Sequence, residues 1–476
     1  MATTKVSALA ETTSPQANDE LLVNQSGVSK KLKVSNFVNA AITANTAKVT
    51  NATHSGEVTG ATVLTIADDK VDEANLKVGN APTNGYVLTA QSGQSGGLLW
   101  AVDAGGATSI NGLSDGTTPA TGNIGLGTGA VDSITTGDYN VGLGDDALTA
   151  TTSGHSNTAN GYKALAANTT ANNNTAIGRH SLLTNTTGAD NTAVGRDSMR
   201  MNLTGSSNVG IGYETLYANT SGAYNVALGA LALDANTTAN NNTAIGYSAL
   251  TANTTGHSNV AIGKDAFASN TTGQRGVAIG TDALQANTTA NYGVAIGFEA
   301  LAANTTGANN IAIGKSTLQA NITGANNTAI GFESMVANTT GAANTSVGTN
   351  SLDANTTGQQ NVASGYLALT TNTTGSYNNA FGVGALNDNT AGSNNTAVGH
   401  TALYSNNTAS YNSAVGSEAL YNNTTGAGNT ASGYAAMYAN TTGSSNTAIG
   451  REALESNTTA SNNTAVGFES LNSNTT

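Results

Sequence analysis

The sequence predicts an all-β protein: a parallel β-solenoid of 17-residue rungs that follows a small mixed N-terminal region. A glycine recurs at a constant 17-residue interval from Gly127 to Gly467 without one insertion or deletion, and a fixed period is typical of repeat architectures. Only 9% of residues are charged and 5% aromatic, so few bulky side chains could fill a globular core. The residue before the glycine is usually Ile or Val, and the residue three before it is often Thr or Val. We call these glycines anchor glycines and count positions from them.

Residues 242–258 illustrate how one rung divides. They predict a short strand at Thr243-Ala244-Ile245, a corner at the anchor Gly246, a second strand at Tyr247–Ala252 and a turn at Asn253–Gly256. The β-branched residues at −3 and −1 lie two apart and share one face of a strand. Leu, Met or Phe at +4 and a small residue at +6 also share a face. A helix at 247–252 is the alternative, but six residues are too few to nucleate one.

The Asn-Thr-Thr-Gly turn has residues that tolerate left-handed backbone or bond their own backbone. Several rungs have alanine in place of its glycine, so positive φ is not needed there: Ala171, Ala239, Ala290, Ala409 and Ala460. Stacked rungs repeat every ~4.8 Å, which predicts a rod of roughly 100 Å and asparagine ladders at −4 and +7. The alanine at −2 faces away from positions −3 and −1. An apolar residue there predicts a strand buried on both sides and self-association along the rod.

Charge and composition disfavour several classes of partner. The formal net charge is −13, and the 15 basic residues are expected to be scattered among 28 acidic ones, which disfavours nucleic acid. The absence of cysteine excludes disulfides and thiolate metal sites. No apolar run reaches the length of a membrane span, so we expect no membrane insertion. The first residues lack the apolar core of a secretory signal, so we expect no export by that route.

The segments NTAIGYSAL, NVAIGKDAF and NTAVGFESL resemble the repeats in the heads of trimeric autotransporter adhesins. That resemblance implies a left-handed parallel β-roll and a trimer of rolls packed around an axis. The adhesin repeat is commonly shorter than the 17-residue unit of this chain, so the additional residues here are expected to enlarge the Asn-Thr-Thr-Gly turn.

The opening MATTKVSALAETTSPQANDELLVNQSGVSKKLKVSNF and the later text NAPTNGYVLTAQSGQSGGLLWA resemble tail fibres of tailed bacteriophages. In such fibres the N-terminal region attaches to the virion and the distal region meets the host. The resemblance implies a virion-attachment segment at 1–50, with a short helix at 36–47. It also implies a connector with short strands at 51–118. The 17-residue period itself places the solenoid of about 21 repeats at 119–476.

The candidate ligand site is a tyrosine ladder. Tyr404, Tyr421 and Tyr438 all lie at +5 in three successive rungs, where an outward aromatic ladder could stack on sugar rings; fibre packing or surface decoration is the alternative. The histidines fall at different phases and predict no catalytic or zinc site. Acidic residues at +2, such as Asp265 and Asp282, indicate a solvated edge, with Ca²⁺ binding as the alternative. We expect no catalytic residues, no cofactor and no metal site.

The predicted function is that of a structural protein, a phage tail fibre acting as spacer and host-cell adhesion appendage. The expected partners are further copies in a homotrimer, a virion tail or baseplate protein, and a host surface glycan or protein receptor. The expected location is the virion. The alternative is a bacterial cell-surface adhesin or extracellular filament of the trimeric autotransporter type. An ice-binding solenoid is disfavoured, because adjacent threonines in the turn cannot both point from one flat face.

Overall fold

The structure is a computed structural model that describes residues 20–25, 28–33, 86–90, 98–102 and 120–475. The chain divides into two compact units, Met1–Gly106 and Ala107–Thr476. In the first unit, β1 (Glu20–Gln25) pairs antiparallel with β2 (Val28–Lys33), and β3 (Tyr86–Ala90) pairs antiparallel with β4 (Leu98–Val102). The helix predicted at 36–47 lies outside the described residues.

The second unit is the predicted solenoid, with one three-residue strand in each rung. The strands are β5 (Ile124–Leu126), β6 (Val141–Leu143), β7 (Thr158–Asn160), β8 (Thr175–Ile177), β9 (Thr192–Val194), β10 (Val209–Ile211), β11 (Val226–Leu228), β12 (Thr243–Ile245), β13 (Val260–Ile262), β14 (Val277–Ile279), β15 (Val294–Ile296), β16 (Ile311–Ile313), β17 (Thr328–Ile330), β18 (Thr345–Val347), β19 (Val362–Ser364), β20 (Asn379–Phe381), β21 (Thr396–Val398), β22 (Ser413–Val415), β23 (Thr430–Ser432), β24 (Thr447–Ile449) and β25 (Thr464–Val466).

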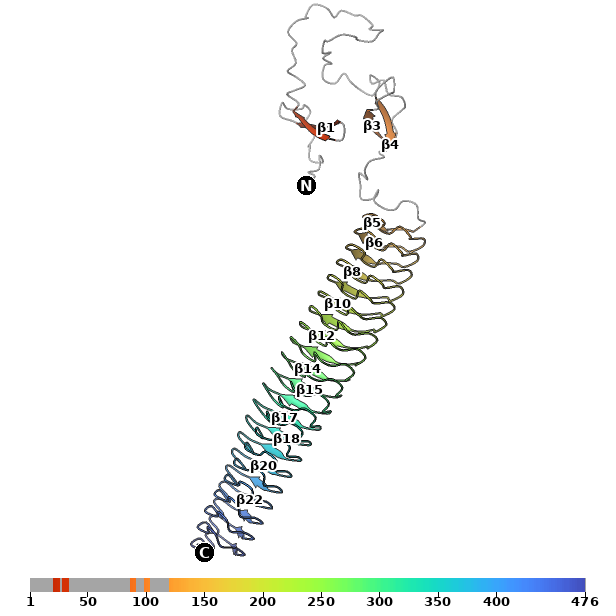
Figure 1. Cartoon of the computed structure of the whole chain (residues 1–476). Helices are drawn as coiled ribbons and strands as arrows, with labels where there is room; N and C mark the ends of the chain where they lie inside the picture. The colour runs from red at the N-terminus through yellow and green to blue at the C-terminus, as the bar shows by residue number, and fades with distance from the viewer. Residues whose placement is uncertain (1–19, 26–27, 34–85, 91–97, 103–119, 476) are drawn as a thin grey trace, which may run out of the picture. The chain divides into compact units, whose positions relative to one another are not determined.

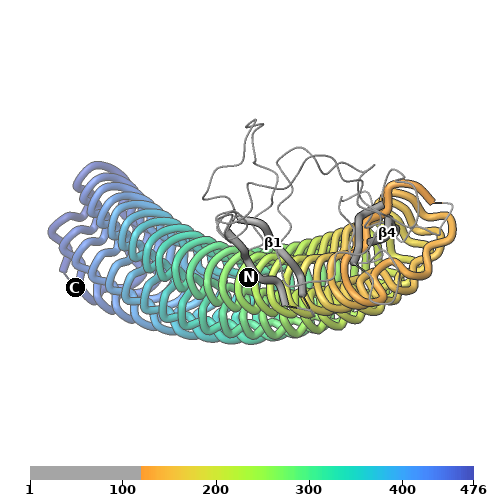
Figure 2. The backbone as a smooth tube through the Cα atoms, turned by 90° about the horizontal axis from the view of Figure 1, so that it is seen from above, coloured from red at the N-terminus to blue at the C-terminus, as the bar shows by residue number. Residues whose placement is uncertain are grey.

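Neighbouring strands of the solenoid are parallel and in a constant 17-residue register. Thr243 lies opposite Val260, Ala244 opposite Ala261, and Ile245 opposite Ile262. The pairing runs from β5 to β25 as one open ladder, whose two end strands make no pairing with each other. Figure 1 shows the rungs stacked one upon another, and Figure 2 shows the same coils as a tube. The predicted fold class, a parallel β-solenoid of 17-residue rungs, is confirmed.

The interior of each coil is filled from both sides of the rung. The alanine at −2 is fully buried, as at Ala244 and Ala261, and so are the residues at +3 and +4, as at Ala249 and Leu250. The residues at −3 and −1 point out of the coil and stay partly exposed. The prediction that the alanine at −2 faces out of the coil toward another chain is therefore wrong. The alanines pack inside their own coil, and the β-branched face is the one available to another chain.

The residues from +1 to +6 form a return segment that is not a strand. In the rung of Gly246, Ser248 and Leu250 both have φ near 53°, in the left-handed region. The N–H of Ser248 donates to the preceding rung at Ala230 O, and that of Leu250 donates to the next rung at Ala266 O. The predicted second strand is wrong because left-handed residues turn the chain repeatedly. The peptide groups nevertheless bond to both neighbouring rungs, as ladder groups do.

Two files of buried asparagines close the turn end of the solenoid. At +7, Asn253 Nδ2 donates to Asn236 Oδ1 at 3.0 Å and to Gly256 O of its own turn at 2.9 Å. At −4, Asn242 Nδ2 donates to Gly256 O at 2.9 Å. The side-chain oxygen of Asn242 accepts from the backbone N–H of Asn259 at 2.9 Å. The +7 file is the predicted amide ladder, whereas the −4 file binds mostly backbone groups.

Two neighbouring rungs depart from the common core at positions that fit each other. Phe267 stands at +4, where most rungs have leucine, and is 1% exposed. Gly276 stands at −4 of the following rung, where most rungs have asparagine. A Cβ placed on Gly276 would lie 2.5 Å from the Phe267 ring. The glycine therefore leaves the space that the larger ring occupies.

Candidate functional site

The predicted tyrosine ladder forms, with its rings stacked on one another. The centroids of Tyr404 and Tyr421 are 5.2 Å apart with planes 9° apart, and those of Tyr421 and Tyr438 are 5.2 Å apart with planes 14° apart. All three side chains are partly buried. Because the rings face each other, only the outer faces of the first and last ring stay free for a sugar ring to stack on. The ladder therefore offers mainly ring edges and hydroxyl groups.

The surroundings of the ladder are acidic and partly buried. Burial raises the pKa of the Tyr421 hydroxyl above its ordinary value, and the neighbouring Tyr404 and Tyr438 raise it further, followed by Asp388 and Glu418. Burial also raises the pKa of the Asp388 carboxyl. These groups would disfavour an anionic ligand at the ladder.

The acidic residues at +2 bind different partners from rung to rung. Asp265 forms an ion pair with Lys264, with 3.0 Å between Oδ2 and Nζ. Asp282 Oδ1 accepts a hydrogen bond from Gln285 Nε2 at 2.8 Å. Among the residues that the structure describes, no group of three or more His, Cys, Asp or Glu side chains could hold a metal ion.

The expectation of scattered basic residues is wrong for one stretch of the solenoid. Residues 120–475 contain eight Lys and Arg residues, of which four are spread over the rungs from Gly263 onward: Lys264, Arg275, Lys315 and Arg451. The other four lie at +1, +2 or +5 of three successive rungs, and we call them the basic patch: Lys163, Arg179, Arg196 and Arg200. Aligning the rungs by their anchor glycines would have revealed this cluster from the sequence.

A buried carboxylate organises the basic patch. The Asp197 side chain is 6% exposed and lies 3.1 Å from Arg196 Nε, 3.6 Å from Arg200 Nη1 and 3.2 Å from His180 Nδ1. Arg196 also lies over the Tyr213 ring, 4.6 Å from its centroid, and donates from Nη2 to the Tyr213 hydroxyl at 2.9 Å. These contacts hold the guanidinium groups in place while leaving the Arg196 side chain 55% exposed.

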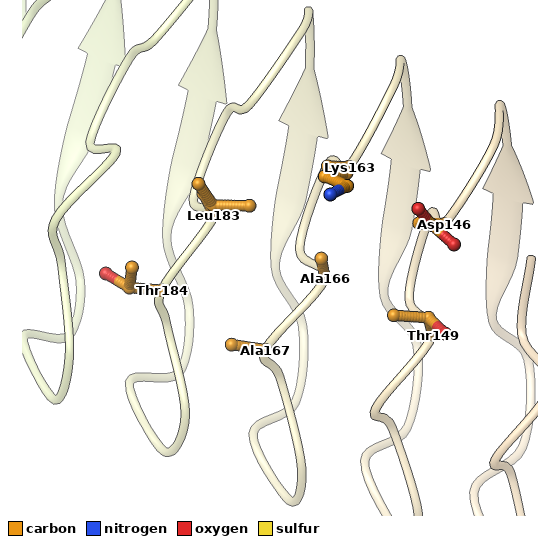
Figure 3. Close-up of a pocket in the computed structure, with 7 residues that line it drawn as sticks. All are labelled: Asp146, Thr149, Lys163, Ala166, Ala167, Leu183 and Thr184. Carbon is orange, nitrogen blue, oxygen red and sulfur yellow. The ribbon is translucent and has the colours of Figure 1, made fainter.

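A shallow depression runs along the solenoid beside the basic patch; we call it the flank depression. One of its sides is formed by side chains at position +2 and the other by side chains at positions +5 and +6: Asp146, Lys163, Thr149, Ala166, Ala167, Leu183 and Thr184. Figure 3 shows that these side chains come from the return segments of successive rungs, with the strands behind them. Lys163 belongs to both the depression and the patch.

The outward face of the strands is a long apolar surface. Position −1 is Ile, Val or Leu in eleven consecutive rungs from Ile177 to Val347. Ile296 and Ile313 are each 36% exposed, and Val347 is 40% exposed. Isolated proteins rarely expose a contiguous apolar surface of this extent. We call the residues at −3 and −1 together the outer strand face.

In comparisons with known proteins, no family model matches this chain, and neither a curated protein nor a solved structure gives a significant match. Within the residues that the structure describes, no helix is long and apolar enough to cross a membrane.

Proposed function

We propose that this chain is a structural fibre protein in which three copies pack together through their outer strand faces. The observation that carries the proposal is the unvarying 17-residue rung, stacked in register from β5 to β25. Such a stack is stiff along its axis, because every rung is hydrogen-bonded to the rung on either side. A rod of this kind can hold two structures at a fixed distance.

The apolar outer strand face supports self-association of the rods. Burying apolar surface stabilises an interface, and each of the eleven consecutive rungs with Ile, Val or Leu at −1 adds to the buried area. Copies of one chain are the natural occupant, because the spacing of the exposed side chains on one rod matches that on another. The left-handed coil and the threefold arrangement are proposed from the resemblance to adhesin heads.

The biological role that we propose is a phage tail fibre, located on the virion as a spacer and host-cell adhesion appendage. Support comes from the resemblance of residues 1–37 and 80–101 to tail-fibre sequences. Residues 1–50 would attach to a tail or baseplate protein, and the solenoid would extend toward a host glycan or protein receptor. The resemblance of the repeats to adhesin heads favours the second candidate, a bacterial surface adhesin or extracellular filament.

Sedimentation of the full chain tests the assembly. We expect a particle of three times 47.1 kDa. Replacing two exposed side chains with charge, Ile296→Glu with Ile313→Glu, should give a folded monomer. The matched control, Thr306→Glu with Thr323→Glu, places the same charges on the exposed turns of the same two rungs and should remain trimeric. A monomeric wild-type chain would contradict the trimer and reopen the single-chain alternatives, including ice binding.

Electron microscopy with an antibody against the solenoid tests the location. Label on the tails of phage particles would support the tail fibre. Label on the surface of bacterial cells with none on particles would favour the adhesin.

A further inference from the structure

We infer that the basic patch and the flank depression together form a binding site for an anionic polysaccharide. The inference deepens the adhesion role proposed above by naming the chemistry of the ligand, and it rests on that role. The shared chemistry is a sugar chain that carries carboxylate or phosphate groups.

The concentration of positive charge is the first observation. Half of the Lys and Arg residues in 120–475 lie between Lys163 and Arg200, in a chain whose net charge is −13. Arg179 is exposed, and no ion pair or hydrogen bond within the described part of the chain holds its side chain. Asp197 is one carboxylate shared between Arg196 and Arg200. Two further carboxylates lie nearby: Asp146 lines the depression, and Glu214 accepts from the Tyr213 hydroxyl. The four cations outnumber these three carboxylates, so the site keeps a small excess of positive charge that attracts anions.

The second observation is that the site is ordered before a ligand arrives. Arg196 is fixed by Asp197 and by the Tyr213 ring and hydroxyl. Arg200 is fixed by Asp197 and by the Tyr217 hydroxyl, 3.3 Å from its Nη1. A guanidinium group that is already held in place loses little conformational entropy on binding an oxyanion. Asp197 thus acts as a positioning residue.

The third observation is the shape and lining of the flank depression. It spans three rungs, or about 10 Å along the axis at ~4.8 Å per rung, which suits a short piece of a linear sugar chain. Ala166 and Ala167 are small, Leu183 offers apolar surface, and the Asp146 carboxylate and Thr149 and Thr184 hydroxyls can bond sugar hydroxyl groups. Lys163 brings positive charge to the depression itself. The depression lies on the return side of the rung, so packing through the outer strand face would leave it open.

Nucleic acid is a less suitable ligand. Its affinity depends on neutralising many consecutive phosphates, whereas the basic patch covers three rungs and the remaining solenoid is acidic. The depression also lacks aromatic side chains on which bases could stack.

The test measures binding of the full chain to three immobilised polymers: polygalacturonate, poly(glycerol phosphate) and neutral dextran. We expect binding to an anionic polymer that weakens as salt is added and no binding to dextran. Preference for polygalacturonate would identify carboxylate as the recognised group, and preference for poly(glycerol phosphate) would identify phosphate. Wild-type chain that binds neither anionic polymer would overturn the inference.

Two variants locate the site. Lys163→Gln with Arg179→Gln removes two charges that no ion pair uses in the described part of the chain, and should weaken binding at least tenfold. The matched control, Arg275→Gln with Lys315→Gln, also removes one Arg and one Lys that no ion pair uses in the described part of the chain. These two residues lie on distant rungs, so the control should change binding less than about threefold. Ala167→Trp fills the depression without altering charge and should also weaken binding. Equal losses in the two charge variants, or unchanged binding by Ala167→Trp, would contradict the site.

A parallel assay compares the wild-type chain with the Lys163→Gln and Arg179→Gln variant for binding to bacterial cells, and it separates this inference from the proposed function. Cell binding that survives the Lys163 and Arg179 changes would support adhesion and contradict this site. Polymer binding that these changes abolish, with no binding to cells, would support the site and contradict the adhesion role.

Discussion

The strand and the return segment of one rung both bond their backbone groups to the neighbouring rungs, but they do so with different backbone conformations. Both bond to the rungs on either side, but β12 (Thr243–Ile245) is extended, whereas the return segment is left-handed at Ser248 and Leu250. β-Branched side chains suit the first and are strongly disfavoured in the second. The sequence follows this division: Ile and Val dominate at −1, and from Leu148 onward every residue at +4 is Leu, Met or Phe. Backbone conformation, more than hydrophobicity, therefore explains why −1 and +4 carry different apolar residues.

Replacing the anchor glycine at the junction of the two segments should cause the largest loss of stability. Gly246 has φ of 135°, and a Cβ there would clash with the carbonyl oxygen of Gly263 in the next rung. We expect Gly246→Ala to cost on the order of 4 kcal/mol, because a strained backbone and a clash between rungs act together. Hydrogen exchange of the neighbouring rungs would measure the loss. In the control Gly256→Ala a Cβ would also approach a carbonyl oxygen of the next rung, that of Gly273, but Gly256 has no positive φ. Five rungs carry alanine at the same position, +10, so the backbone can adjust to it, and the control should cost less than Gly246→Ala. Similar losses at both glycines would contradict the argument.

Exchanging isomers between the two segments is the next test. Leu250→Ile places a β-branched side chain at φ of 53° and should destabilise the solenoid by about 2–4 kcal/mol. Ile245→Leu, the reverse change in the same rung, should cost less than about 1 kcal/mol. Urea unfolding followed by circular dichroism would measure both. If the two changes cost the same, the side chain's volume rather than the backbone would govern the preference.

Contact between a return segment and the residue just before the next strand can be tested through Phe267 and Gly276, which precedes β14 (Val277–Ile279). Gly276→Asn alone should cost about 1–3 kcal/mol, because the new side chain overpacks against the Phe267 ring. Phe267→Leu alone leaves a cavity and should cost a similar amount. Together they restore the combination found in most rungs, so the double variant should be more stable than the sum of the single losses predicts. Additive losses in this double-mutant cycle would show that the two positions do not compensate each other.

The smallest predicted effect concerns charge on the return segment. Burial raises the pKa of the Asp353 carboxyl above its ordinary 3.8, and Glu333 adds to this. A raised pKa in the folded state means that stability falls as pH rises through the folded pKa. Asp353→Asn should therefore stabilise the protein at pH 7, by less than about 1 kcal/mol for a partly exposed group. The urea midpoints should converge at pH 3, and a difference that does not change with pH would contradict this origin.

The candidate sites were predictable to different degrees. Spacing placed Tyr404, Tyr421 and Tyr438 in one file, but it could not show that their rings face each other. The basic patch was open to prediction, since Lys163, Arg179, Arg196 and Arg200 fall in successive rungs. The contacts of Asp197 were not, because burial of one carboxylate among three neighbours depends on side-chain directions that a repeat alignment does not contain.

The 17-residue period, the solenoid class, the apolar +4 position and the asparagine files followed from the sequence alone. Strict repetition without insertions allows identical residues to stack, and that requires no knowledge of how the chain turns within a rung. Tertiary structure decided that Ala244 packs inside the coil and Ile245 outside. A period of two tells which residues share a face, but not which face points inward. Tertiary structure also decided that Ser248 and Leu250 in the return segment have left-handed backbone. Their hydrogen bonds to the two neighbouring rungs outweigh the ordinary preference of leucine for right-handed or extended backbone.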